Sequence, residues 1–294
     1  MAFLGNEGVA NRFQGDILSL NYIKPTIEAK SVLIPGVTCA FDVEVKGQTA
    51  YYYESDSFII SDGDAGRKLD LELTGAKRKS FDLDKSYGIG GIIPMVGKDT
   101  LSEDIVGRKL VDSAKGVVAK DNAKGLAAMI NGITVWTYPK ADTAYQAVVD
   151  AIVHFNEVNK VAFTSKTIDG TEATSNETAK GGWVAKTLIV GPAFYGALQK
   201  CEEFVKGNAE FSVNEAVVGR CAGLDVVYAP ELPSTCEFVV MSPDGFIAPK
   251  GVSATEVFGQ VEGRPGAALA QAEMVYAYKQ LDVDQILPCK KAAN

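Results

Sequence analysis

The sequence predicts an α+β fold, in which strands and helices follow one another in mixed order. Residues 41–46 and 69–74 alternate apolar and polar side chains with the period of half-buried strands. Residues 101–130 carry apolar side chains at helical spacing over an unusually long stretch. Residues 143–248 place short apolar runs between helical patterns, which indicates a mixed lobe.

The composition is that of an ordered globular chain without a general affinity for polyanions. Of the 294 residues, 47% are apolar and 22% are charged, unlike the composition of disordered proteins. The formal net charge is −8, so we expect no general binding to nucleic acid or to an anionic membrane surface. The nearest basic cluster, Lys77-Arg78-Lys79, leaves two interpretations open: a solvated strand end, or a contact with an acidic neighbouring subunit.

The N-terminal residues and the cysteines favour a location in a reducing cytoplasm. Residues 1–7 lack the basic stretch and apolar run of a secretion signal. The sequence also contains no run of about 18 apolar residues, the length needed to cross a membrane. The 5 cysteines are an odd number, widely spaced, without a Cys-x-x-Cys pair. We expect buried thiols rather than metal ligands. The cysteines are Cys39, Cys201, Cys221, Cys236 and Cys289.

The first part of the chain predicts an arm followed by a strand. Residues 1–30 begin with small and polar residues and show weak periodicity, so we expect an extended N-terminal arm with room for one short helix. After Cys39 the alternation is strict, with Phe41, Val43 and Val45 on one face and charged residues on the other. This pattern predicts a strand with one face in water.

Residues 47–80 predict a long β-hairpin. An aromatic run at 51–53 and an apolar run at 58–60 precede a turn cluster at 61–66. In the second alternating run, at 69–74, leucines interleave with polar side chains. A two-stranded ribbon with a narrow apolar side is marginally stable unless another surface covers that side. We therefore expect a partner surface to cover it.

The helix predicted over residues 101–130 follows a segment of turn-forming residues. Ser102 is the predicted N-cap, acidic residues occupy the first turn, and Asn131-Gly132 ends the helix. At 1.5 Å per residue, such a helix spans roughly 40 Å, so we expect a spine that crosses the subunit. The preceding residues expected to break regular structure are Gly88, Gly90, Gly91 and Pro94.

The next region begins with a helix predicted at 143–158, whose apolar stripe includes Ala151 and Phe155. Residues 164–182 are rich in Thr, Ser, Gly and Glu, and their composition leaves a surface loop or a β-excursion open. Leu188-Ile189-Val190 predicts a short buried strand.

Pro192 starts a predicted helix with Phe194, Leu198 and Val205 on one face. Further strands are predicted at 223–229, 237–241 and 245–248. Residues 267–287 leave two interpretations open. The alternation of Met274, Tyr276 and Tyr278 with their neighbours favours a closing strand pair, and the other interpretation is a helix from Ala267 followed by one strand.

No catalytic, cofactor-binding or metal-binding residue is predicted. His154, the single histidine, lies in an amphipathic helix, where we expect a surface or boundary position. One histidine excludes His-rich zinc sites and two-His metalloprotease motifs. Acidic residues lie mostly on alternating wet faces or in first helical turns, where solvation and capping explain them.

The glycine-rich run at 88–99 does not satisfy the phosphate-loop pattern. Five residues instead of four separate Gly91 from Gly97, and Asp99 stands where a hydroxyl is needed for magnesium. No Gly-x-Gly-x-x-Gly follows a strand, so a dinucleotide fingerprint is also absent from the sequence. We expect these glycines to form structural turns.

The order of these features resembles the tailed-bacteriophage major capsid protein family, which has the Hong Kong 97-type fold. Three stretches add to the likeness. Residues 187–198 resemble the strand, proline and helix of the axial domain in such proteins. Residues 218–233 resemble a recurrent segment, in which an apolar strand follows a glycine and ends near Leu-Pro, and residues 237–250 resemble the strand and turn that come next.

The resemblance implies an extended β-hairpin loop that lies on a neighbouring subunit, a spine helix in a peripheral domain, and an axial domain that meets its copies at capsomer centres. The implied parts are an N-terminal arm (1–30), a peripheral-domain strand (31–46), the extended loop (47–80), the peripheral domain (81–140) with the spine helix (101–130), the axial domain (141–250) and a return to the peripheral domain (251–294).

The resemblance also implies a structural protein and not an enzyme. Copies would assemble as pentamers and hexamers into the icosahedral head shell of a tailed phage, enclosing double-stranded DNA without sequence-specific contacts. Scaffolding, portal and decoration proteins would be further partners, and no cofactor or membrane is implied. Assembly would take place in the bacterial host cytoplasm, and the chain would reside in the virion. The chain departs from family members with a long N-terminal coiled coil, which leaves a separate scaffolding protein or cleavage before residue 1 open.

The ribbon is the predicted contact with neighbouring subunits. Two rival hypotheses remain: an encapsulin-like nanocompartment shell with the same fold, and a soluble enzyme that acts through carboxylates. The candidate contact residues are Tyr51, Tyr52, Tyr53, Phe58, Ile60, Leu69, Leu71, Leu73, Lys77 and Arg78.

Overall fold

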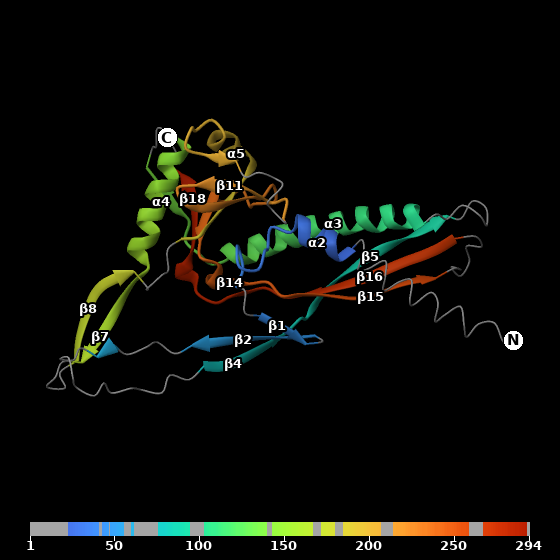
Figure 1. The fold of residues 1–294 in the computed structure, drawn as a ribbon, viewed down its shortest axis with the longest axis horizontal. Coiled ribbons are helices and arrows are strands. Elements are labelled where there is room, and N and C mark those ends of the chain that lie inside the picture. Colours follow the sequence, from blue (N-terminus) through green and yellow to red (C-terminus); the bar gives the residue numbers. More distant parts are fainter. Residues whose placement is uncertain are drawn as a thin grey trace.

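A seven-stranded sheet and a long three-stranded sheet are joined by a long helix (Figure 1). The computed structural model describes residues 23–40, 43–46, 48–55, 60–61, 76–94, 103–139, 143–166, 172–179, 185–206, 214–258 and 267–292. The larger sheet has the strand order β10-β11-β12-β9-β13-β18-β6. Its strands are β6 (Trp136–Tyr138), β9 (Thr187–Val190), β10 (Val205–Lys206), β11 (Val217–Cys221), β12 (Leu224–Tyr228), β13 (Phe238–Met241) and β18 (Ile286–Lys291).

The two central strands of this sheet are buried on both faces. Every residue of β9 and of β13 is buried, and the two strands pair antiparallel with Val190 opposite Phe238. Apolar runs without alternation are typical of strands that are covered on both sides. The strands predicted at 188–190 and 237–241 are confirmed.

Helices α4 (Ala144–Val158) and α5 (Pro192–Leu198) cover one face of the sheet. Their buried side chains form one hydrophobic core with Phe238 of β13. Thr143 caps α4, because its Oγ1 accepts a hydrogen bond from the Gln146 backbone N–H at 3.1 Å. The helix predicted at 143–158 is confirmed. We name the seven-stranded sheet with α4 and α5 the lobe.

The other face of the lobe packs against the last turns of α3 (Glu103–Ile130), where Leu126 and Met129 are fully buried. Over 28 residues α3 spans about 42 Å, and it runs from the lobe along the long sheet (Figure 1). The helix predicted at 101–130 is confirmed, and its predicted N-cap, Ser102, lies outside the described residues. Gly132 follows with φ of 75°, a left-handed conformation that favours glycine.

At Gly125, helix α3 packs closely against Leu33 and Tyr278. A Cβ at this position would lie 2.3 Å from Leu33 Cδ1 and 3.2 Å from Tyr278 Cε1. Gly125→Ala should therefore lower the free energy of unfolding by about 1–2 kcal/mol, because overpacking outweighs the gain in helix propensity. Gly116→Ala should raise it by up to about 1 kcal/mol, because no heavy atom lies within 4 Å of that Cβ position. Urea denaturation compares the two variants, and equal stabilisation by both would contradict the close packing.

The long sheet has the order β15-β16-β5 and lies beside α3 (Figure 1). Its strands are β5 (Lys85–Pro94), β15 (Lys250–Phe258) and β16 (Ala267–Tyr276). β16 pairs antiparallel with β5 along its whole length, from Ala267 opposite Pro94 to Tyr276 opposite Lys85. Of the two interpretations of the last segment, the strand is right and the helix from Ala267 is wrong.

The predicted interruption at Gly88, Gly90, Gly91 and Pro94 is also wrong, because all four residues lie within β5. The continuous ladder with β16 outweighs the weak strand propensity of glycine. β5 is an edge strand and Pro94 is its last residue, a position where the missing proline N–H is tolerated.

The helix predicted from Pro192 is shorter than expected, and Val205 does not lie on it. The helix ends at Leu198, where the backbone N–H of Cys201 bonds to the Leu198 carbonyl and tightens the chain into a turn. Val205 opens β10 instead. Two strands of the lobe, β6 and β18, lie outside residues 141–250, the predicted axial domain. The predicted domain boundaries stay predictions.

Shorter elements complete the described fold. α2 (Lys24–Lys30) packs against α3, and it is a short helix within the predicted arm, whose residues 1–22 lie outside the described part. β1 alternates between half-buried and exposed residues, as predicted for 43–46. The remaining elements are β1 (Val43–Lys46), β2 (Thr49–Ser55), β3 (Ile60–Ser61), β4 (Ala76–Asp82), β7 (Lys160–Lys166), β8 (Glu172–Ala179), β14 (Phe246–Ile247), β17 (Lys279–Gln280) and the 3₁₀ turns η2 (Pro243–Gly245) and η3 (Val283–Gln285).

Candidate assembly surface

The described base of the predicted ribbon is a three-stranded sheet and not a two-stranded one. β2 and β4 pair antiparallel, with Thr49 opposite Asp82 and Ser55 opposite Ala76. β1 pairs with the other edge of β2. A third strand stabilises a ribbon that would be marginal as an isolated hairpin. We name β1, β2 and β4 the ribbon base.

One face of the ribbon base is covered within the same subunit. Tyr52 is 5% exposed, and its ring meets the Phe81 ring edge-on at a centroid distance of 6.0 Å. Lys279 Nζ donates a hydrogen bond to Tyr52 Oη at 2.7 Å and lies 4.9 Å from the centroid of the Tyr52 ring. We expected a partner to cover the apolar side of the ribbon, but at the base Lys279 of the same chain covers the Tyr52 and Phe81 rings.

A charged and aromatic cluster lies elsewhere on the ribbon base. The Arg78 guanidinium lies 3.9 Å from the centroid of the Tyr51 ring and 3.5 Å from a Glu44 carboxylate oxygen. Lys46 donates a hydrogen bond to Glu44, which is the main reason why the pKa of this carboxyl is lowered. Because Arg78 and Glu44 are exposed, the cluster presents positioned polar groups that a second surface could contact.

The predicted contact residues are divided by the structure. Tyr51 and Arg78 contact each other at the surface, whereas Tyr52 packs into its own subunit. Tyr53, Ile60 and Lys77 lie in β2, β3 and β4 respectively. The residues outside the described part are Phe58, Leu69, Leu71 and Leu73. Contact of this set with a neighbouring subunit stays a prediction.

The predicted ribbon segment also meets the β-excursion of the second region. β3 pairs parallel with β7, with Ile60 opposite Ser165, and β7 pairs antiparallel with β8. Of the two interpretations of residues 164–182, the β-excursion is therefore the right one. Sequence reasoning missed the β3–β7 pairing, because local alternation does not say which distant strand lies alongside.

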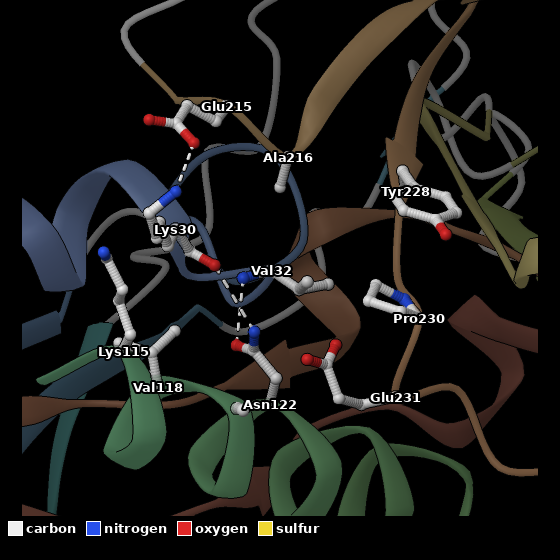
Figure 2. Close-up of a pocket in the computed structure, with 11 residues that line it drawn as sticks. Lys30, Val32, Lys115, Val118, Asn122, Glu215, Ala216, Tyr228, Pro230 and Glu231 are labelled. Atoms are coloured by element: carbon white, nitrogen blue, oxygen red, sulfur yellow. Dashed lines mark hydrogen bonds and ion pairs between the residues drawn. The ribbon is translucent and has the colours of Figure 1, made fainter. Parts of the chain in front are cut away.

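A pocket of about 230 Å³ opens between α2, α3 and the lobe (Figure 2). Lys30 forms an ion pair with Glu215 at 2.5 Å on one side of it. On the other side the Glu231 carboxyl is partly buried, and burial raises its pKa. The described residues that line the pocket include no histidine, cysteine or serine. The lining residues are Lys30, Val32, Lys115, Val118, Ala119, Asn122, Glu215, Ala216, Tyr228, Pro230 and Glu231.

Metal-ligating side chains are not clustered in the described ranges: no group of three or more His, Cys, Asp or Glu residues there could hold a metal ion. His154 stacks on Trp136 with ring centroids 4.7 Å apart and is partly exposed, which confirms the predicted boundary position. Among the helices that the structure describes, none is long and apolar enough to cross a bilayer.

The cysteines should differ sharply in reactivity. Cys39 is buried, and burial raises its pKa to about 12, whereas Cys201 is partly exposed. Because the thiolate is the nucleophile, Cys201 should react with iodoacetamide at about pH 8 at least roughly tenfold faster than Cys39 in the folded protein. Mass spectrometry of digests measures both rates, and urea-unfolded protein is the control in which they should converge. Equal rates in the folded protein would contradict the burial of Cys39.

The prediction of buried thiols is confirmed for four of the five cysteines, and Cys201 is the exception. Burial raises the pKa of Cys221 and of Cys236 to about 11 each, and Cys289 is fully buried. The described structure contains these thiols as free cysteines. Cys201 departs from the prediction: it lies in the turn that follows α5 and is partly exposed.

Comparison with known proteins finds a likeness of structure and none of sequence. No family model matches the chain, and no curated protein sequence matches it. The mature capsid of bacteriophage PhiM1 superposes with a TM-score of 0.51 at 13% identity, covering 90% of this chain and 88% of that one. The capsid of the cyanophage P-SCSP1u superposes with a TM-score of 0.51 at 13% identity, covering 88% of each chain.

A virus-like particle from Pyrococcus furiosus is similar over a still larger share. It covers 95% of this chain and 98% of its own, with a TM-score of 0.50 and 11% identity. At such low identity the likeness shows a common fold. The Hong Kong 97-type α+β fold predicted from the sequence is confirmed.

Proposed function

We propose that this chain is a major capsid protein, a subunit that assembles with its own copies into the icosahedral head shell of a tailed phage. The observation that carries the proposal is the likeness of fold to capsid subunits over about nine-tenths of the chain. The division into peripheral and axial domains, with boundaries at residues 141 and 250, is part of the proposal. Pentamers and hexamers are the expected capsomers.

The ribbon supplies the proposed contact between subunits. Its base is fixed to its own chain through Tyr52 and Lys279. We expect the segment beyond the base to lie on a neighbouring subunit. Leucines at 69, 71 and 73 are the apolar side chains expected to lie on that neighbour. Individually weak contacts suffice in a closed shell, because each subunit is held by several of them at once.

Double-stranded DNA is the proposed content of the shell, and the net charge of the chain is compatible with it. A net charge of −8 suits a container for double-stranded DNA, because a shell that bound the phosphate backbone tightly would hinder packaging and release. Scaffolding, portal and decoration proteins are the other proposed partners, with assembly in the cytoplasm of a bacterial host. No catalytic step is part of the proposal.

Assembly of the purified chain tests the proposed function. The protein is expressed alone and examined by mass photometry and negative-stain electron microscopy over a range of concentrations. We expect capsomers or closed shells whose masses are multiples of the subunit mass. A protein that stays strictly monomeric at high concentration, with or without added crowding agent, would contradict the proposal.

A nanocompartment shell that encloses protein cargo is the second candidate function. The likeness to the virus-like particle from Pyrococcus furiosus supports it, because that chain is covered over 98% of its length. Shells purified from cells of the natural source distinguish the two candidates. DNA of uniform length inside the particle favours the phage head, whereas a stoichiometric enzyme inside it favours the nanocompartment.

A further inference from the structure

The centre of α3 holds a buried ion pair that bridges distant parts of the chain. Asp121 of α3 is paired with Lys250, and their side chains are 1% and 14% exposed. Tyr278 Oη donates a hydrogen bond to the Asp121 carboxylate. Lys250 Nζ also donates to Ser31 Oγ at 2.8 Å. We name Ser31, Asp121, Lys250 and Tyr278 the latch.

The latch lies where the chain passes between the lobe and the long sheet. Lys250 is the first residue of β15, and it follows β14, whose Phe246 lies in the core beneath the lobe. Tyr278 lies between the end of β16 and the start of β17. The Asp121 carboxylate on α3 therefore contacts the chain at the start of β15, through Lys250, and just after the end of β16, through Tyr278.

Segment 30–33 is held between α3 and the lobe at the same place. On the α3 side, Asn122 Oδ1 accepts a hydrogen bond from the Val32 backbone N–H at 3.0 Å (Figure 2). On the lobe side, Asn214 Nδ2 donates to the Ser31 carbonyl at 3.0 Å. The close packing of Gly125 against Leu33 lies one helical turn after Asp121. The contacts around Asp121 thus define how α3 meets the lobe.

A buried ion pair contributes little net stability, because the desolvation of two charges offsets most of their attraction. The ion pair does, however, require one geometry. Two apolar surfaces can slide past each other and stay in contact, whereas a charge pair with shared hydrogen bonds cannot. At a joint between two packed parts, such a pair selects one relative orientation.

We propose that the latch fixes the angle between the lobe and the α3–long-sheet part, and thereby determines the curvature of the shell that the subunits form. This inference rests on the proposed function for its consequence in the shell. A closed shell of one diameter requires that its subunits meet their neighbours at a small, fixed set of angles, those of the pentamers and hexamers. A subunit with a variable internal angle would build shells of variable diameter.

The test uses the full chain with both charges removed, Asp121→Asn together with Lys250→Met, so that no unpaired charge is left buried. Asp112→Asn is the matched control, because Asp112 lies on the same helix in an exposed ion pair with Lys115. We expect the double variant to melt near the wild-type temperature but to form shells of mixed diameters, whereas the control forms shells of one diameter. Uniform wild-type shells from the double variant would overturn the inference and leave the proposed function standing.

Hydrogen exchange of the unassembled subunit provides a second readout that does not depend on shells. The amides of Val32 and Leu33 should exchange at least roughly tenfold faster in the double variant, because the segment they belong to loses the hydrogen bond from Lys250 to Ser31 and keeps only those to Asn122 and Asn214. Unchanged exchange would overturn the inference even if no variant assembles. Absence of shells from the wild-type protein itself would count against the proposed function instead.

Discussion

Replacement of Leu71 by aspartate should abolish shell assembly while the subunit still folds. In the run 69–74 the leucines alternate with polar side chains, which predicts that Leu71 lies on the apolar side of the ribbon. Burial of a leucine side chain at a contact contributes about 1.5–3 kcal/mol. A buried, unpaired carboxylate would reverse that contribution at every copy of the contact in the shell. Electron microscopy measures assembly, and circular dichroism with thermal unfolding measures the fold.

Glu72→Gln is the matched control for this experiment, because the alternation predicts that the side chain of residue 72 lies on the opposite, polar side. It should assemble like the wild-type protein. Leu71→Asp subunits that fail to fold would show that the ribbon packs on its own chain throughout, as the ribbon base does at Tyr52. Normal shells from Leu71→Asp would remove this leucine from the proposed contact.

Phe238→Ala should lower the free energy of unfolding by about 3–5 kcal/mol. The Phe238 side chain is fully buried in β13, which is paired on both edges by β9 and β18. Its ring lies 4.3 Å from the Phe194 ring and 5.5 Å from the Tyr138 ring, measured between centroids. Removal of the ring leaves a cavity that neighbours held by sheet and helix cannot fill.

Urea unfolding of the unassembled subunit measures this effect. Val153→Ala on α4 is the control, because that side chain is 54% exposed, and its effect should stay within about 0.5 kcal/mol. A similarly small effect of Phe238→Ala would mean that the core of the lobe collapses around the missing ring.

The elements that could be predicted from the sequence are those whose local pattern and tertiary role agree. The long helix α3 and the buried strand β9 have this consistency, since helical spacing and an unbroken apolar run each match the observed burial. Gly88 and its neighbours misled because their local preference was for turns, whereas the ladder with β16 decides the structure. The brief strand β6 carries too short a pattern to be seen.

The candidate site was only partly predictable, for a related reason. Alternation identifies a side chain as lying on one face of a strand, and it says nothing about what covers that face. Tyr52 is covered by Lys279, which is 227 residues away along the chain. The latch was missed because Asp121 and Lys250 look like ordinary surface charges in the sequence, and only the fold brings them together in a buried place.

The strand order of the lobe affects when, during synthesis, the lobe can finish folding. β18 is an interior strand, placed between β13 and β6, although it comes from residues 286–291. During synthesis β13 emerges long before β18, so its edge stays unpaired until the ribosome has translated these residues. Exposed strand edges invite wrong pairing, and chaperones bind such intermediates. A nascent or truncated chain that lacks β18 cannot complete the sheet of the lobe, so we expect the lobe to fold only after residues 286–291 have left the ribosome.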